Sequence, residues 1–167
     1  MTTPTRFTII QDDVTGPEIT ALIALHLAAV DDGTAAEYRF ALGVEALRAP
    51  GITLWSLWEG TNLLGCAALK DLGEGQGEVK SMRTDPAHLR RGVAGMLLGH
   101  LIGQARARGW HRLNLETGTN ASFIPAHALY RRFGFVDCGP YADYVESPHN
   151  RYMTLALESG AVDRGPG

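Results

Sequence analysis

The residues best suited to chemistry lie between positions 78 and 95, where a short strand pattern is followed by a turn and the start of a helix. Small residues at Gly92 and Ala94 would let a ligand approach the backbone closely. The first amides of a helix have no partner inside it and carry the positive end of its dipole, so such a segment can bind phosphate oxygens. Arg90 and Arg91 add positive charge. The alternative is an ordinary strand–turn–helix junction with solvated arginines.

The elements that must position this segment follow from hydrophobic periodicity. A strand over 78–83 ends before a helix over 92–108, whose apolar residues recur at helical spacing and which Gly109 terminates. Further strands are predicted at 7–10, 52–58, 63–69, 110–116 and 152–157, and further helices at 16–30, 35–48 and 125–133. This order predicts a mixed sheet flanked by helices, of the α/β or α+β class, without the regular alternation of a Rossmann fold.

Length and composition predict one compact domain over residues 1–167, with a flexible tail at about 159–167. Apolar residues make up 45% of the 167 residues, which is enough to form a core. The formal net charge of −3 argues against nucleic acid or a membrane surface as a partner, because binding to either needs a concentrated basic face.

The spacing of the cysteines and the length of the hydrophobic runs indicate in which cellular compartment the protein works and whether it binds a metal. Cys66 and Cys138 lie far apart without metal-ligand spacing, which favours free thiols, no metal and a reducing compartment. No signal-peptide pattern and no run of membrane-spanning length is present, so we expect a cytoplasmic protein.

Two separated blocks resemble the GNAT (Gcn5-related N-acetyltransferase) superfamily. One is the strand–turn–helix at 78–95, and the other is residues 126–135, which fit the family pattern A-x-x-L-Y-x-x-x-G-F at every specified position. The chain is also similar to the YsnE-like bacterial branch of that superfamily over most of residues 14–157. It departs from the family at Leu89, the usually polar first position of the phosphate loop, and at Phe123, where an asparagine is common.

The resemblance implies a GNAT fold whose mostly antiparallel sheet is splayed between its fourth and fifth strands, and acetyl-CoA as the acyl-donor cosubstrate. It places the pantetheine arm along the backbone of residues 82–84 and the pyrophosphate at 90–95. The expected cosubstrate-binding residues are therefore Met82, Arg83, Thr84, Arg90, Arg91, Gly92, Val93, Ala94 and Gly95. The tetrahedral oxyanion would meet a backbone amide of the same strand.

Two residues carry the expected catalytic roles. Tyr130 falls on the family tyrosine that acts as general acid toward the CoA sulfur; alternatively, it packs its ring and exposes its hydroxyl. Glu78 resembles the general base of histone-acetyltransferase-like members. It could instead be an ordinary strand-end charge, or pair with Lys80 on the same face of the strand.

Four further residues are candidates for contact with the acceptor: His26, Glu116, Tyr141 and Asp143. Glu116 ends an otherwise apolar strand, where it could attract a cationic amine or anchor a loop. His26 lies on an apolar helix face, where packing is the alternative. Tyr141 and Asp143, with Tyr144, follow a Gly-Pro turn and could form a wall of the acceptor site, whereas His127 is expected to face solvent.

Together these features predict an N-acetyltransferase that transfers an acetyl group from acetyl-CoA to the amine of a small molecule by direct attack in a ternary complex. The alternatives are a peptide or protein N-acetyltransferase and a non-catalytic acyl-CoA-binding sensor. A homodimer is common in the family and stays open.

Overall fold

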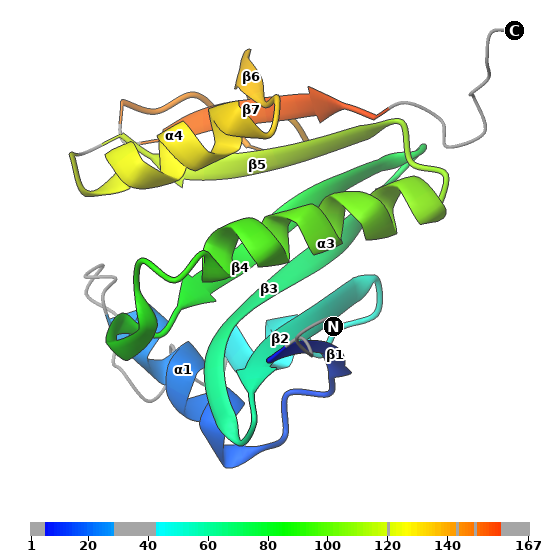
Figure 1. Cartoon of the computed structure of the whole chain (residues 1–167). Coiled ribbons are helices and arrows are strands. Elements are labelled where there is room, and N and C mark those ends of the chain that lie inside the picture. Colours follow the sequence, from blue (N-terminus) through cyan, green and yellow to red (C-terminus); the bar gives the residue numbers. More distant parts are fainter. Residues whose placement is uncertain (1–5, 29–42, 120, 143, 149, 158–167) are drawn as a thin grey trace, which may run out of the picture. The chain divides into compact units, whose positions relative to one another are not determined.

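The computed structural model describes residues 6–28, 43–119, 121–142, 144–148 and 150–157. Its elements are β1 (Phe7–Asp12), α1 (Pro17–Ala28), β2 (Ile52–Glu59), β3 (Asn62–Gly73), β4 (Gln76–Thr84), α3 (Val93–Ala107), β5 (Arg112–Gly118), α4 (Ile124–Arg132), β6 (Val136–Cys138) and β7 (Asn150–Ala156), with short 3-10 turns at Pro86–His88 and Ala121–Phe123 (Figure 1). None of the described helices is both long enough and apolar enough to cross a bilayer.

The described strands form one mixed sheet in the order β1-β2-β3-β4-β5-β7-β6. β5 runs parallel to β4, while β7 is antiparallel to both β5 and β6. The β4–β5 ladder ends at the pair Val79↔Leu115, although β4 continues to Thr84 and β5 to Gly118. This early end of pairing is the predicted splay between the fourth and fifth strands, and the mixed sheet with helices that the sequence predicts is confirmed.

The described chain divides into two compact units, one formed by residues up to 69 with 81–98 and the other by 70–80 with the residues from 99 onward. In the first unit, β1 pairs antiparallel with β2 along its whole length. Its core is formed by side chains from α1, the helical turn at 43–47 and the strands: Val14, Ile19, Leu22, Ile23, Val44, Leu47, Leu54, Leu63, Cys66 and Ala68.

In the second unit, α4 lies along β5 and β7 (Figure 1). Its side of the sheet buries Leu113, Leu115 and Met153, which alternate with the polar residues of the opposite face. That opposite face carries Glu78, Asn114 and Glu116 on neighbouring strands, because Glu78 pairs with Asn114 and Glu116 follows two residues later. β-strand alternation thus places two carboxylates on one face.

The structure departs from the predicted elements at several ends. β3 extends beyond Leu69 to Gly73, so the turn before β4 is shorter than the glycine-rich stretch suggested. β6 was not predicted, since its three residues include no buried side chain. Of the helix expected at 35–48, residues 43–47 are helical, and the rest up to 42 lies outside the described residues, as does the tail at 159–167. The single domain over 1–167 stays a prediction.

Gly77 is required by close packing inside the second unit. A Cβ built there would lie 2.0 Å from the ring of Trp110, which no small shift can relieve. We therefore expect Gly77→Ala to lower the free energy of unfolding by about 2 kcal/mol, as overpacking of a core does. Urea denaturation monitored by tryptophan fluorescence measures the change.

The matched control is Gly103→Ala, since Gly103 lies in α3 with no atom within 4 Å of an added Cβ. Alanine in an open helical position should raise stability by up to about 1 kcal/mol. Equal stability of Gly77→Ala and the wild type would mean that Trp110 does not pack on Gly77.

Candidate functional site

Glu78 is unusual among the charged residues of the second unit because its side chain is buried. It is 2% exposed. Its Oε2 atom accepts hydrogen bonds from the hydroxyls of Tyr141, at 2.8 Å, and Tyr144, at 2.7 Å. Its Oε1 atom is buried and has no hydrogen-bond partner among the described residues. Burial of a carboxylate with one unpaired oxygen costs folding free energy, so Glu78 presents an acceptor atom that is not needed for the fold.

Lys80 is the cation nearest to Glu78 in the described part of the chain. Its Nζ atom lies 3.8 Å from Glu78 Oε1 and 3.5 Å from the Tyr144 hydroxyl. The pairing of Glu78 and Lys80 on one strand face is therefore confirmed. Both distances are long, and the Lys80 side chain is 31% exposed, so the ammonium group neutralises charge without saturating Oε1.

Three tyrosine rings surround this carboxylate. The centroids of Tyr141 and Tyr144 are 5.2 Å apart, and each lies 5.7 Å from the centroid of Tyr152 on β7. Burial, and then the neighbouring Glu78 carboxylate, raises the pKa of both Tyr141 and Tyr144. Both hydroxyls hence keep their protons at neutral pH and act as donors to Glu78.

Glu116 extends the site along β5. It pairs with Tyr152 across the β5–β7 ladder, and its Oε2 accepts a hydrogen bond from Asn150 Nδ2. Burial raises the pKa of Glu116, and the nearby Glu78 charge raises it further, while Lys80 partly opposes both effects. Glu116 thus belongs to the same acidic network and is anchored to the start of β7, while its contact with an acceptor stays a prediction.

Tyr130 lies on α4 with its ring packed edge-on against Phe135 at 5.9 Å. It is 8% exposed, and burial raises the pKa of its hydroxyl to about 12. The packing role named as the alternative is therefore confirmed for the ring, and the phenol remains protonated over the whole physiological pH range. Its role as a catalytic acid stays a prediction.

The turn before α3, in the first unit, is open beside Gly92. Gly92 adopts φ +80°, and no atom lies within 4 Å of the position of an added Cβ, so the space beside it is open. The helix begins at Val93, and Val93, Ala94 and Gly95 fall in its first turn with their amides free of helical partners. Arg90 is exposed.

Arg91 differs from the free cation expected at this turn. Its guanidinium group donates to Glu59 Oε2 at 2.9 Å and lies 3.2 Å from His88 Nδ1. It also stacks over the Phe7 ring at 5.6 Å. Since this ion pair already engages one edge of the guanidinium group, Arg90 and the backbone amides are the less occupied donors.

Residues 82–84 end β4 directly after a distorted position. Ser81 adopts φ +54°, a conformation that is rare for residues with a side chain. This distortion comes two residues after the last β4–β5 pair, which leaves the strand end at Met82, Arg83 and Thr84 outside that ladder. Such backbone is suited to bind an extended ligand, as the resemblance implies.

The sequence also singled out His26, Asp143 and His127, and the structure describes only the last of these side chains. His26 lies in α1, but its side chain is outside the described part, as is all of Asp143. The expectation that His127 faces solvent is wrong: it is buried, with Nε2 2.9 Å from the Gly118 carbonyl and Nδ1 3.2 Å from Arg151 Nη1. His127 precedes Tyr130 by three residues and so shares its buried helix face.

Sequence analysis missed Asn150 and Tyr152 as members of the acidic network. Both lie on β7 and alternate with residues of the opposite face. The alternation of Tyr152, Met153 and Thr154 was a usable signal for the face on which Tyr152 lies. Asn150 was missed because the strand was expected to begin only at residue 152.

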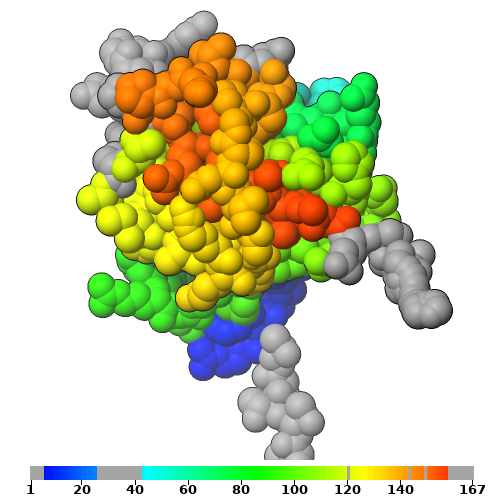
Figure 2. Space-filling view, turned by 90° about the horizontal axis from the view of Figure 1, so that it is seen from above, coloured from blue at the N-terminus to red at the C-terminus, as the bar shows by residue number. Residues whose placement is uncertain are grey.

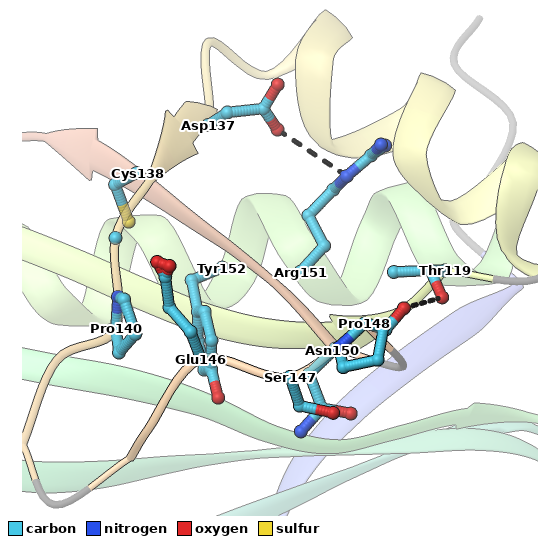
Figure 3. Close-up of a pocket in the computed structure, with 11 residues that line it drawn as sticks. Thr119, Asp137, Cys138, Pro140, Glu146, Ser147, Pro148, Asn150, Arg151 and Tyr152 are labelled. Carbon is cyan, nitrogen blue, oxygen red and sulfur yellow. Dashed lines mark hydrogen bonds and ion pairs between the residues drawn. The ribbon is translucent and has the colours of Figure 1, made fainter.

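A cavity of about 620 Å³ adjoins this network in the second unit (Figure 3). Asn150 and Tyr152 line it together with the loop residues Thr119, Gly139, Pro140, Glu146, Ser147 and Pro148, and with Asp137, Cys138 and Arg151. Figure 2 shows the segment between β6 and β7, in orange, at the surface beside β7. The cavity is therefore walled by loops on one side and by the start of β7 on the other.

Two interactions connect residues that line this cavity. Arg151 lies 3.9 Å from Asp137, and Thr119 donates to the Pro148 carbonyl at 2.8 Å (Figure 3). Across the described residues, no cluster of three His, Cys, Asp or Glu side chains forms a set of metal ligands.

Comparison with known proteins places these features in a family. Residues 20–135 match the acetyltransferase (GNAT) family. The chain is 49% identical over 151 residues to the uncharacterised N-acetyltransferase YedL of Escherichia coli, covering 90% of this chain and 95% of YedL. It is 51% identical over 146 residues to the uncharacterised N-acetyltransferase YsnE of Bacillus subtilis, covering 87% and 97%.

Two further comparisons agree with this family. An IAA acetyltransferase of Azospirillum brasilense is 35% identical over 124 residues, or 73% of this chain and 79% of that protein. A crystal structure of a putative acyl-CoA N-acyltransferase from Klebsiella pneumoniae superposes with a TM-score of 0.74 at 28% identity, covering 90% of this chain and 97% of that one. The chain thus belongs to the GNAT acetyltransferase family and is an acyltransferase.

Proposed function

We propose that this protein transfers an acetyl group from acetyl-CoA to the primary amine of a small molecule, with Glu78 as the general base. The observation that carries the proposal is the Glu78 carboxylate, whose Oε2 is occupied by two tyrosine hydroxyls while the buried Oε1 has no hydrogen-bond partner among the described residues. An N–H group of the acceptor supplies the missing donor.

The local charge favours a cationic acceptor. Glu78 and Glu116 contribute two acidic groups, and Lys80 is a cation within contact distance of Glu78. An arriving ammonium group gains an ion pair with Glu78 and, where it meets a tyrosine ring, a cation–π interaction. The site therefore binds the protonated amine that dominates in neutral solution.

Acetyl transfer from the bound ammonium group requires two protons to leave the nitrogen. Glu78 Oε1 accepts the first, and the freed amine lone pair forms a bond to the thioester carbonyl carbon. The second proton leaves the nitrogen to solvent as the tetrahedral intermediate collapses and its carbon–sulfur bond breaks, which releases the CoA thiolate and the N-acetyl product. Tyr141 and Tyr144 keep the carboxylate fixed during this step, since both hydroxyls donate to Oε2.

Tyr130 is proposed to stabilise the departing thiolate by a hydrogen bond. Its pKa of about 12 lies well above the value of about 8.5 typical of a thiol, so complete proton transfer would be uphill by about 5 kcal/mol. A phenol that remains protonated can still donate strongly to a developing thiolate. The thiolate takes its final proton from solvent.

Acetyl-CoA is proposed to bind through the first turn of α3. The free amides of Val93, Ala94 and Gly95, with Arg90 beside the open space at Gly92, supply the donors for its pyrophosphate. The backbone of 82–84 is proposed to bind the pantetheine arm. A cytoplasmic location and a homodimer remain predictions from sequence and family.

The test is acetyl-CoA turnover by the purified full chain, followed by thiol release against a panel of small amines, amino acids and peptides. We expect small primary amines to raise thiol release far above slow hydrolysis, with the N-acetyl product seen by mass spectrometry. Acetylation of peptides alone would assign the enzyme to peptide acceptors. Binding of acetyl-CoA with no responding acceptor would indicate a sensor.

Tyr130→Phe should lower kcat by about 10- to 100-fold, because a hydrogen bond to a charged group contributes about 1.5–3 kcal/mol. The dissociation constant of acetyl-CoA should change by less than about threefold, since the ring still packs against Phe135. Steady-state thiol release and calorimetry measure the two quantities.

The control is Phe135→Leu, which changes the packing partner of the Tyr130 ring but keeps the Tyr130 hydroxyl. We expect a much smaller loss of kcat there. An unchanged kcat in Tyr130→Phe would leave Tyr130 with a packing role alone.

A further inference from the structure

A second, smaller cavity lies wholly inside the first unit. Its volume is about 40 Å³, and its walls are mostly apolar: Leu22, Ile23, Gly43, Leu47, Cys66, Ser81 and Arg83. Leu22 and Ile23 come from α1 and Leu47 from the helical turn at 43–47. A cavity needs roughly 10–15 Å³ of such space to hold one water, so this one can hold a small polar end group but not a nucleotide.

Arg83 is the charged residue among these walls. Its Nε atom is buried and has no hydrogen-bond partner among the described residues, and no ion pair in the described part of the chain includes Arg83. Two other arginines of this unit have partners, since Arg48 donates to the Val14 carbonyl and Arg91 pairs with Glu59, whereas Arg90 is exposed to solvent. Arg83 thus carries a positive charge that no carboxylate of the described residues pairs with, and an external anion can bind there.

The chemistry of the cavity favours a carboxylate. A guanidinium group presents parallel N–H donors that match the two oxygens of a carboxylate, and apolar walls strengthen the attraction by excluding water. The neighbouring Cys66 offers no competing anion, because burial raises the pKa of its thiol to about 12. Cys66 donates weakly instead to the Ser81 carbonyl at 3.5 Å.

We propose that Arg83 binds a carboxylate of the acceptor, so that the acceptors are amino carboxylic acids rather than simple amines. The inference rests on the proposed function, which assigns the phosphates of acetyl-CoA to the α3 turn and leaves the acceptor as the reactant able to bring a carboxylate. Arg83 is then a specificity-determining residue through its side chain, whereas its backbone belongs to the strand end proposed for pantetheine.

The experiment compares amino acids with the amines that lack only the carboxylate: leucine with isoamylamine, and phenylalanine with phenethylamine. For each pair, the ratio of kcat/KM for the acid to that for the amine is measured in the wild type, Arg83→Gln, Arg83→Met and Arg83→Lys. We expect a wild-type ratio above about 10. It should fall about 10- to 100-fold in Arg83→Gln and Arg83→Met, the range set by a hydrogen-bonded charge pair, with Arg83→Lys in between.

Arg132→Gln is the matched control, because Arg132 is an exposed arginine at the end of α4. Its ratio should equal that of the wild type. Circular dichroism of each variant shows that it folds. A ratio that survives in Arg83→Gln, while the KM of acetyl-CoA rises, would overturn the proposal and assign the guanidinium group to the donor.

A binding measurement separates this inference from the proposed function. In the presence of CoA, calorimetry should show that N-acetyl-leucine binds at least about 10-fold more tightly than N-isoamylacetamide, and that Arg83→Gln removes this preference. Equal binding of the two amides to the wild type would overturn the carboxylate site even if amines are acetylated. A preference for N-acetyl-leucine that Arg83→Gln removes would support the site even if no amine is turned over.

Discussion

Glu78→Gln should lower kcat/KM for the amine acceptor by about 10²- to 10⁴-fold, the range over which general-base catalysis contributes. Glutamine keeps the shape of the side chain and can still accept hydrogen bonds from Tyr141 and Tyr144 through its amide oxygen. It cannot take a proton from the ammonium group or attract its charge. The loss therefore reports on the basicity and the charge of the carboxylate, and not on packing around it.

The measurements are steady-state thiol release with amine and acetyl-CoA varied in turn, together with the dissociation constant of acetyl-CoA. We expect the latter to change by less than about threefold. Glu45→Gln, which alters an exposed glutamate of the first unit, should leave both quantities unchanged. A Glu78→Gln enzyme with wild-type kcat/KM would show that water or another group removes the proton.

The pH dependence of Glu78→Gln provides a second, independent check. Without a base, the enzyme depends on the fraction of acceptor that arrives as the neutral amine, which rises tenfold per pH unit below the amine pKa. The logarithm of kcat/KM should therefore climb with a slope near one until the pH reaches the pKa of the chosen amine. Acceptors with lower pKa values should level off at correspondingly lower pH.

The sequence predicts the part of the fold that depends on local patterns. α3 and its turn follow from apolar spacing between Gly92 and Gly109, and both ends lie within two residues of the expected ones. β6 was not predicted because its three residues, two of them exposed, form a strand only by pairing with β7, which is a long-range contact. β3 likewise continues past Leu69, where its residues turn polar and exposed.

For the site, the sequence supplied candidates but not their partners. Glu78 and Tyr141 were both named, yet nothing local indicates that the tyrosine hydroxyl donates to that carboxylate from 63 positions further along the chain. The contact depends on the register of β5 with β7, which brings Glu116 opposite Tyr152. Arg91 is a different case. Its charge suggested that it binds a phosphate, whereas in the structure it forms an ion pair with Glu59.

Gly92→Glu should weaken acetyl-CoA binding by about 100-fold. A carboxylate about 5 Å from a phosphate, at an effective dielectric constant of about 20, is repelled by about 3 kcal/mol. The position itself tolerates bulk, because no atom lies within 4 Å of an added Cβ. The φ of +80° adds strain for any residue with a side chain. The affinity for acetyl-CoA, measured by calorimetric titration, is therefore compared among variants that all carry a side chain at position 92.

Two control variants isolate the charge. Gly92→Ala carries the backbone strain with a single methyl group, and we expect it to lose less than about fivefold in affinity. Gly92→Lys carries comparable bulk with the opposite charge, so it should bind acetyl-CoA more tightly than Gly92→Glu by about two orders of magnitude or more. Because salt screens exposed charges, this difference should shrink between low salt and about 1 M salt. Equal affinities of Gly92→Glu and Gly92→Lys would mean that the phosphates of acetyl-CoA do not bind at the first turn of α3.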